Sequence, residues 1–340
     1  MSDPIRRTLT AIVASVLLCM TAMATAATSA PTPASGDSAR AAQLPKHFLT
    51  GYWHNFVNQA GAVRLADTPD EYDLIAVAFG EATTNPGEIS FGIDPELSAA
   101  LGGYTDADLK ADVEALHQRG KQVILSVGGE RGQVNVGDAA AAARFADSVY
   151  ALMQEYGFDG VDIDLEHGLH PQYMAQALRS LHEKVGSDLI ITMAPQTVDM
   201  QSTDGSYFQL ALKIKDILTV VNMQYYNSGS MLGCDGKVYA QGSVDFITSL
   251  ACIQLENGLR PDQVGLGLPA GAGAAGSGVV DPSVVTSALD CLATGADCGS
   301  FTPPRTYPGI RGAMTWSINW DIANGGGFAS TVGPHLDTLP

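Results

Sequence analysis

The chain has 340 residues, 46% of them hydrophobic and 16% charged, which is enough to bury a large core. Its formal net charge of −18 argues against nucleic acids and anionic membrane surfaces as partners. The charge excludes these two classes of partner and says nothing about a neutral substrate.

Residues 1–27 follow the pattern of a secretory signal peptide. Arg6 and Arg7 precede a short apolar run, which is followed by small residues. That run is too short to span a bilayer comfortably, and no later segment approaches about 20 uninterrupted apolar residues. Residues 28–45 have the composition of a disordered linker. We therefore expect a secreted, extracellular protein whose single catalytic domain spans residues 46–340.

Eight short apolar runs predict strands, and most of them alternate with helical patterns. The predicted strands cover residues 48–53, 72–79, 121–127, 158–165, 189–194, 218–226, 264–268 and 312–318. The predicted helices cover residues 106–118, 138–156, 171–185, 207–215, 244–256, 282–292 and 327–336, and a weak turn at 58–70 replaces the first helix. This eightfold alternation predicts an α/β fold, a (β/α)8 TIM barrel. A doubly wound open sheet is the alternative, although no G-x-G-x-x-G follows the first strand.

Three carboxylates stand two residues apart in the fourth predicted strand, at Asp162, Asp164 and Glu166. Successive side chains of a strand point to opposite faces, so the three acids share one face and the apolar residues between them share the other. Neighbouring acids would lie roughly 6.5 to 7 Å apart, and their repulsion should raise at least one pKa. A solvated acidic strand and a metal site are the alternatives, but no His or Cys cluster supports a metal. The triplet therefore indicates an active site that needs no metal or other cofactor.

In a TIM barrel the chemistry lies at the carboxyl ends of the strands, and Glu166 ends the fourth strand. The other strand ends carry Tyr52, Trp53, Asn55, Ser126, Gly128, Met193, Gln196, Gln224, Tyr226, Asn227 and Trp316. Aromatic rings stack on sugar faces and amides bond sugar hydroxyls, so this set indicates a carbohydrate site. A phosphate site would need basic residues, and none of these strand ends carries one.

Four cysteines follow the predicted signal peptide, at Cys234, Cys252, Cys291 and Cys298. An even number in an exported chain predicts two disulfides. Four cysteines allow three connectivities, and sequence alone does not choose among them. The shortest loops pair Cys234 with Cys252 and Cys291 with Cys298.

The acidic segment at residues 159–166 resembles the D-x-x-D-x-D-x-E signature of the family 18 glycoside hydrolases, which include many chitinases. Four further segments resemble family motifs in the same order, at residues 126–129, 193–196, 224–227 and 312–317. The likeness covers nearly the whole mature chain. It implies a (β/α)8 enzyme, expected to be monomeric, that acts on chitin and chitooligosaccharides.

The resemblance implies a role for each acid. Glu166 would be the general acid that protonates the glycosidic oxygen. Asp164 would orient the substrate's N-acetyl group, whose oxygen attacks the anomeric carbon, and would stabilise the resulting oxazolinium ion. Asp162 would tune Asp164, and Ser126 would bond to Asp162. The product would keep the anomeric configuration of the substrate.

The resemblance also implies how the sugar is held. Tyr226 would bond the acetamide oxygen, with Tyr225 as the rival, although Tyr225 points to the opposite strand face and is better explained as core. Trp316 would form the floor beneath the sugar and Tyr52 one wall. For Trp53 and Trp320, both a contact with the sugar and ordinary packing in the core remain open. The remaining expected substrate contacts are Ser126, Met193, Gln196, Gln224 and Asn227.

Asp159 has the parity of the apolar face, which predicts a structural hydrogen bond in a turn. His54, His167 and His170 show no ligand spacing and are expected to be surface or loop residues. About a dozen residues separate Leu268 from the next helix, too few for the α+β insertion of some family members, so we expect an open cleft and endo-type cutting.

Three other functions remain open at this stage. The first is an endo-β-N-acetylglucosaminidase that cleaves N-glycan chitobiose cores, and the second is a chitin-binding lectin on the same barrel. The third is a conventional glycosidase in which Asp164 is the covalent nucleophile.

Overall fold

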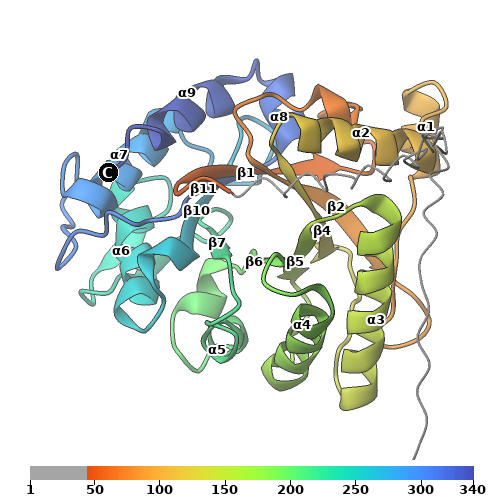
Figure 1. The fold of residues 1–340 in the computed structure, drawn as a ribbon. Helices are drawn as coiled ribbons and strands as arrows, with labels where there is room; N and C mark the ends of the chain where they lie inside the picture. The colour runs from red at the N-terminus through yellow and green to blue at the C-terminus, as the bar shows by residue number, and fades with distance from the viewer. Residues whose placement is uncertain (1–43) are drawn as a thin grey trace, which may run out of the picture. The chain divides into compact units, whose positions relative to one another are not determined.

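The structure is a computed structural model that describes residues 44–340. Eight parallel strands form a closed barrel (Figure 1), because β1 pairs with both β2 and β11. Around the barrel, the strands are β1 (Phe48–His54), β2 (Leu74–Ala82), β4 (Gln122–Gly129), β5 (Gly160–Leu165), β6 (Ile190–Met193), β7 (Val220–Gln224), β10 (Val264–Pro269) and β11 (Gly312–Trp316). The predicted (β/α)8 barrel is confirmed, and the open sheet is excluded.

Helices alternate with these strands along the chain. They are α1 (Pro95–Ala100), α2 (Asp106–Gln118), α3 (Ala139–Tyr156), α4 (Pro171–Val185), α5 (Ser206–Lys213), α6 (Val244–Glu256), α7 (Pro282–Thr294), α8 (Ile318–Ala323) and α9 (Gly327–Leu336). Short 3-10 turns occur at η1 (Leu65–Asp67), η2 (Thr197–Met200) and η3 (Pro261–Gln263). The predicted bounds of α2, α4, α6 and α9 are confirmed, and η1 stands where a turn was expected instead of a helix.

The sequence reading missed the shortest elements. These are α1, α8, the two-residue strand β3 (Ile89–Ser90), and a hairpin formed by β8 (Ser230–Leu232) and β9 (Val238–Ala240). Six residues are less than two helical turns, so hydrophobic periodicity cannot reveal α1 or α8. The hairpin lies between β7 and α6, on the side of the barrel where the strands end.

Each barrel strand is buried on both faces, and alternate residues serve different cores. One cluster, which includes Leu49, Val161 and Ile163, packs between the strands and the surrounding helices. The other, which includes Phe48 and Tyr52, lies within the barrel. Period-two alternation therefore sends the apolar residues of β5 outward and its acids inward.

The start of β5 explains the first two residues of the acidic motif. The Asp159 carboxylate accepts a hydrogen bond from the backbone N–H of Val123 (2.7 Å) and faces His117 Nε2 (2.8 Å). A Cβ on Gly160 would lie 1.9 Å from the carbonyl oxygen of Ile190, so only glycine lets β6 approach. The predicted structural role of Asp159 is confirmed: it ties β5 to β4 and to α2, far along the strand from Glu166.

The predicted signal peptide and most of the predicted linker lie outside the described residues. Leu44, the first described residue, packs against the cluster within the barrel. Among residues 44–340, no helix is both long and apolar enough to cross a membrane.

Both disulfides predicted from the shortest loops are present. Cys234 is joined to Cys252 and Cys291 to Cys298, with sequence separations of 18 and 7 residues. The first bond attaches the β8–β9 hairpin to the buried face of α6, since Cys234 follows β8 and Cys252 lies within α6. The second closes the C-terminal end of α7 onto the loop that follows it.

Removing the first disulfide should destabilise the domain measurably. For the pair Cys234→Ser and Cys252→Ala, we expect the free energy of unfolding to fall by about 3 kcal/mol, because the unfolded chain loses a loop constraint of this length. Guanidinium denaturation followed by tryptophan fluorescence under non-reducing conditions measures the change. The pair Cys291→Ser and Cys298→Ser, which opens the shorter loop only, is the control. A loss below about 1 kcal/mol for the first pair would contradict the prediction.

Candidate active site

Asp162 lies deepest of the three acids, and three hydroxyl groups hold it. Tyr52 Oη and Ser126 Oγ each donate to Oδ2 at 2.7 Å, and Thr192 Oγ1 donates to Oδ1 at 2.6 Å. These donors come from β1, β4 and β6, which surround β5 at this level of the barrel. Burial raises the pKa of Asp162, while hydrogen bonds from Thr192, Ser126 and Tyr52 act in the opposite direction.

Asp164 is one step nearer to the strand end and is only 5% exposed. Its Oδ1 accepts a hydrogen bond from Gln224 Nε2 (3.0 Å), and the same amide nitrogen also donates to the carbonyl oxygen of Ala194 (2.8 Å). Burial, followed by the charges of Asp162 and Glu166, raises the pKa of Asp164 well above its usual range.

Glu166 follows β5 at the mouth of the barrel and is half-buried. Gln196 Nε2 lies 3.5 Å from Glu166 Oε2, at the outer limit of a hydrogen bond. The pKa of Glu166 is raised, mainly by burial and next by the negative charge of Glu130. The charge of His167 lowers this pKa, and that of Asp199 raises it. A carboxyl group with a raised pKa can hold a proton for transfer near neutral pH.

The three acids therefore differ in the number of hydrogen bonds that they accept. Asp162 accepts from three hydroxyls, which favours its charged form, whereas Asp164 accepts from one amide and has an acid on either side. In the described part of the chain, no hydrogen bond joins Asp162 directly to Asp164. The pKa of all three acids is raised, and most of all that of Asp164, which has one donor and an acid on either side.

An aromatic cluster surrounds Trp316 at the same end of the barrel. The ring of Trp316 lies 4.9 Å from His54, 5.5 Å from Tyr52 and 5.8 Å from Phe79, measured between ring centroids. Phe56 stacks on His54 at 4.5 Å. The indole of Trp316 stays partly exposed, so it offers an apolar surface beside the acids.

Three of the predicted substrate contacts are buried in this structure. Met193 is fully buried in the cluster between strands and helices, because its parity is opposite to that of Thr192. Tyr52 is 2% exposed, and its hydroxyl is committed to Asp162, so it supports the site from below and forms no wall. Ser126 is 0% exposed and cannot reach a sugar, although its predicted bond to Asp162 is confirmed.

The two adjacent tyrosines separate as their parity predicts. Tyr225 is fully buried among the helix-facing residues, where Gln254 Nε2 donates to its hydroxyl (3.3 Å). Tyr226 is partly exposed, and burial, followed by the charges of Asp164 and Glu166, raises its pKa. Trp53 is also core, with its indole N–H donating to the carbonyl oxygen of Val63 (2.9 Å).

Asn227 is exposed and has a left-handed backbone conformation, with a φ of 51°. Its side-chain oxygen accepts from the backbone N–H of Ser277 (2.9 Å), which links the loop after β7 to the loop after β10. The structure therefore gives Asn227 a role in joining loops, and its predicted contact with a sugar stays a prediction.

The histidines follow the expectation in two cases of three. His167 and His170 are exposed, as expected. The expectation for His54 is wrong: its ring is 0% exposed, and burial lowers its pKa to about 3. His54 is therefore a neutral ring of the aromatic cluster.

Sequence reasoning missed several residues that build the site. Thr192 is the third donor to Asp162, and it is the polar residue among the inward-facing positions of β6, a signal that strand parity could have provided. Phe79 lies within β2, and Phe56 follows β1; both contribute rings to the aromatic cluster. Tyr207, on α5, accepts from the backbone N–H of Leu165 and gave no such signal, because its position depends on how α5 packs.

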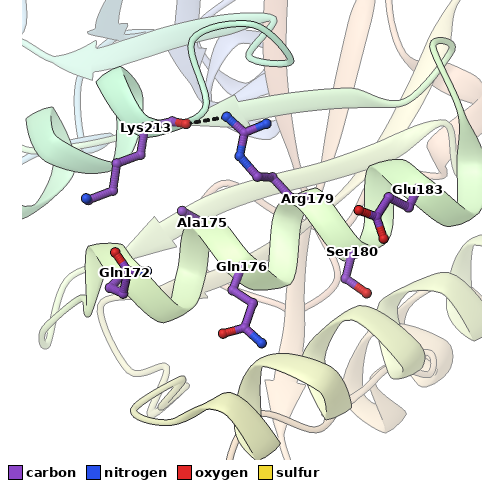
Figure 2. A pocket seen from close by; sticks show the side chains of 7 residues that line it. All are labelled: Gln172, Ala175, Gln176, Arg179, Ser180, Glu183 and Lys213. Carbon is purple, nitrogen blue, oxygen red and sulfur yellow. Dashed lines mark hydrogen bonds between the residues drawn. The ribbon is translucent and has the colours of Figure 1, made fainter.

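A groove on the outside of the barrel has different chemistry (Figure 2). It is lined by Gln172, Ala175, Gln176, Arg179, Ser180, Glu183 and Lys213, which come from α4 and α5. The Arg179 guanidinium is occupied by the Asp216 carboxylate and by the carbonyl oxygen of Lys213. The Arg179 guanidinium is therefore already bound by groups of the fold itself. We assign the catalytic reaction to the mouth of the barrel and not to this groove.

Comparison with known proteins agrees with this assignment. The model of the glycosyl hydrolases family 18 matches residues 49–330. A candidate chitinase A from Streptomyces coelicolor has a solved structure that is 64% identical with a TM-score of 0.84, covering 86% of this chain and 99% of that one. Exochitinase 1 from Streptomyces olivaceoviridis is 36% identical over 88% of this chain, and chitinase Chi52 from Paenibacillus xylanexedens is 33% identical over 92%.

The chain spans 58% of the length of exochitinase 1 and 66% of that of Chi52, so it corresponds to a part of these relatives. The family match nevertheless covers the whole barrel, from the second residue of β1 into α9. It includes all three acids and the residues that hold them. The chain therefore belongs to the glycosyl hydrolases family 18.

Proposed function

We propose that this protein is a secreted chitinase that hydrolyses β-1,4 bonds between N-acetylglucosamine units by substrate-assisted, retaining catalysis. The observation that carries the proposal is the ladder of three acids, in which each carboxyl group has different partners and burial. The names of the relatives support chitin as the substrate. Secretion is supported by the signal-peptide pattern of residues 1–27.

Glu166 is the proposed general acid. Its carboxyl group lies at the barrel mouth, half-buried, and its raised pKa favours the protonated form that a general acid needs. Proton transfer to that oxygen releases the leaving sugar. Glu166 then acts as the base that activates water in the second step, as the same group must when the reaction retains configuration.

Asp164 is the proposed partner of the substrate's acetamide group. The acetamide oxygen attacks the anomeric carbon as the bond to the leaving sugar breaks. The proton of Asp164 passes to Asp162, so that the Asp164 carboxylate accepts the acetamide N–H and stabilises the positive charge that develops there. Gln224 fixes the orientation of Asp164, and the charged Asp162 below favours a proton on Asp164 in the resting enzyme. Because the nucleophile belongs to the substrate, attack is intramolecular, with an effective molarity of up to about 10⁵ M or more.

Trp316 is the proposed floor under the sugar at the cleavage point, and Tyr226, Gln196 and Gln224 are the proposed polar contacts. The rings around Trp316 hold the indole in place, so little side-chain entropy is lost when a sugar stacks on it. Residues 270–281 connect β10 directly to α7, with no inserted domain that would deepen the cleft. This open connection supports endo-type cutting, although an exochitinase is among the relatives.

Products from two substrates test the proposal. We expect the secreted protein to cleave chitooligosaccharides such as the hexamer, to leave a high-mannose glycopeptide intact, and to release β-anomers first. Proton NMR of the anomeric signals during the first minutes, before mutarotation, measures the configuration. Cleavage of the glycopeptide alone would favour an endo-β-N-acetylglucosaminidase, and binding without cleavage would favour a lectin. Release of dimers alone from successive cuts of one chain would contradict endo action.

A further inference from the structure

Asp199 lies in the 3-10 turn η2 after β6, and it is tied to the residue that contacts Glu166. Its Oδ2 accepts from the backbone N–H of Gln196 (3.1 Å), and the backbone N–H of Asp199 donates to the carbonyl oxygen of Gln196 (3.1 Å). The side chain of Gln196 then reaches Oε2 of Glu166. Two reciprocal hydrogen bonds therefore hold the backbone from which this amide extends.

The turn is fixed on its other side as well. Thr197 is buried, and its hydroxyl donates to Ser228 Oγ (2.7 Å) in the loop after β7, while Met200 is buried in the helix-facing core. Asp199 is half-buried between these anchors, and burial raises its own pKa, against the hydrogen bond from Gln196. These contacts fix the turn that carries both Asp199 and Gln196.

We propose that Asp199 is a positioning residue for the general acid: it holds the backbone of Gln196, whose side-chain amide approaches Glu166. This inference rests on the role of Glu166 in the proposed function. The turn thus contributes a geometric constraint, through the amide of Gln196, and an electrostatic one, through the charge of Asp199.

Several other charged groups face Glu166. Glu130 comes from the end of β4, His167 is the next residue in the chain, Asp164 comes from β5 and Tyr226 from the end of β7. Glu130 is exposed and comes before Asp199 among the charges that raise the pKa of Glu166, whereas Asp199 also holds the backbone of Gln196. Glu130 therefore provides a control with the same change of charge on the same target.

The pH dependence of kcat/KM on a soluble chitooligosaccharide tests the proposal. Loss of the neighbouring negative charge lets Glu166 ionise more easily, so Asp199→Asn should move the alkaline limb to lower pH by roughly 0.3 to 1 unit. Glu130→Gln removes a charge that raises the pKa of Glu166 at least as much, so it should move the limb at least as far, but it leaves Gln196 in place and should keep the kcat of the parent. Asp199→Asn keeps an oxygen to accept from Gln196, so its kcat at the optimum should stay within about threefold of the parent, whereas Asp199→Ala should lose a further factor of about 10 in kcat with little change in KM.

A second measurement makes the test independent of turnover. The pH titration of the Glu166 side-chain ¹³C signal, assigned by its absence in Glu166→Gln, reports the ionisation directly in the parent and in Asp199→Asn. A lower midpoint in the variant supports the proposal even if the parent cleaves no chitooligosaccharide, in which case the proposed function alone fails. Coincident titration curves of the parent and Asp199→Asn, or a kcat of Asp199→Ala as high as that of Glu130→Gln, would overturn it.

Discussion

Glu166→Gln is expected to lower kcat on chitooligosaccharides by about 10²- to 10⁴-fold and to leave their binding nearly unchanged. The amide has the size and shape of the carboxyl group and can still contact Gln196. Its N–H groups are too weakly acidic to protonate the glycosidic oxygen. The structure supports a large effect, because Glu166 is the one acid of the ladder at the barrel mouth. Initial rates give kcat, and isothermal titration calorimetry gives the dissociation constant.

Glu183→Gln is the matched control, because it makes the same substitution in the groove between α4 and α5 (Figure 2). This variant should keep the activity of the parent on the same substrates. Unchanged turnover in Glu166→Gln would refute the assignment of the acid. A loss of activity in Glu183→Gln would mean that the outer groove contributes to the reaction.

The fold and the ladder of acids could be predicted because both depend on local periodicity. Period-two alternation in β5 places Asp162 and Asp164 within the barrel, and the same rule places Tyr225 in the core. The same rule predicts the burial of Met193: Ile190, Thr192 and Ala194 face inward, so Met193 faces the helices. That error came from using position along the strand without using the face.

Depth within the barrel could not be read from the sequence. Tyr52 and Trp316 both come from strand ends, yet one is closed under neighbouring strands and the other is partly exposed. The difference depends on which residues of other strands fill the space above them, which is a contact between distant parts of the chain. The burial of His54 between Phe56 and Trp316 and the approach of η2 to Glu166 have the same origin.

Asp164→Asn is expected to lower kcat by about 10²- to 10³-fold, the usual effect of removing one group that stabilises charge in the transition state. The amide can still accept from Gln224, so the resting geometry is preserved. It cannot become negative when the oxazolinium ion forms, and the loss should therefore appear in kcat more than in KM. Steady-state kinetics measure both.

Asp159→Asn is the matched control for this change, because it alters the same residue type at the opposite end of the same strand. Asp159 holds Val123 and His117, so the control should lower stability while keeping kcat. Binding of a thiazoline mimic of the oxazolinium ion adds a second test, since the mimic should bind the parent tightly and Asp164→Asn weakly. If a covalent glycosyl-enzyme is trapped on Asp164 instead, Asp164 is the nucleophile itself, and the acetamide of the substrate is not required for the reaction.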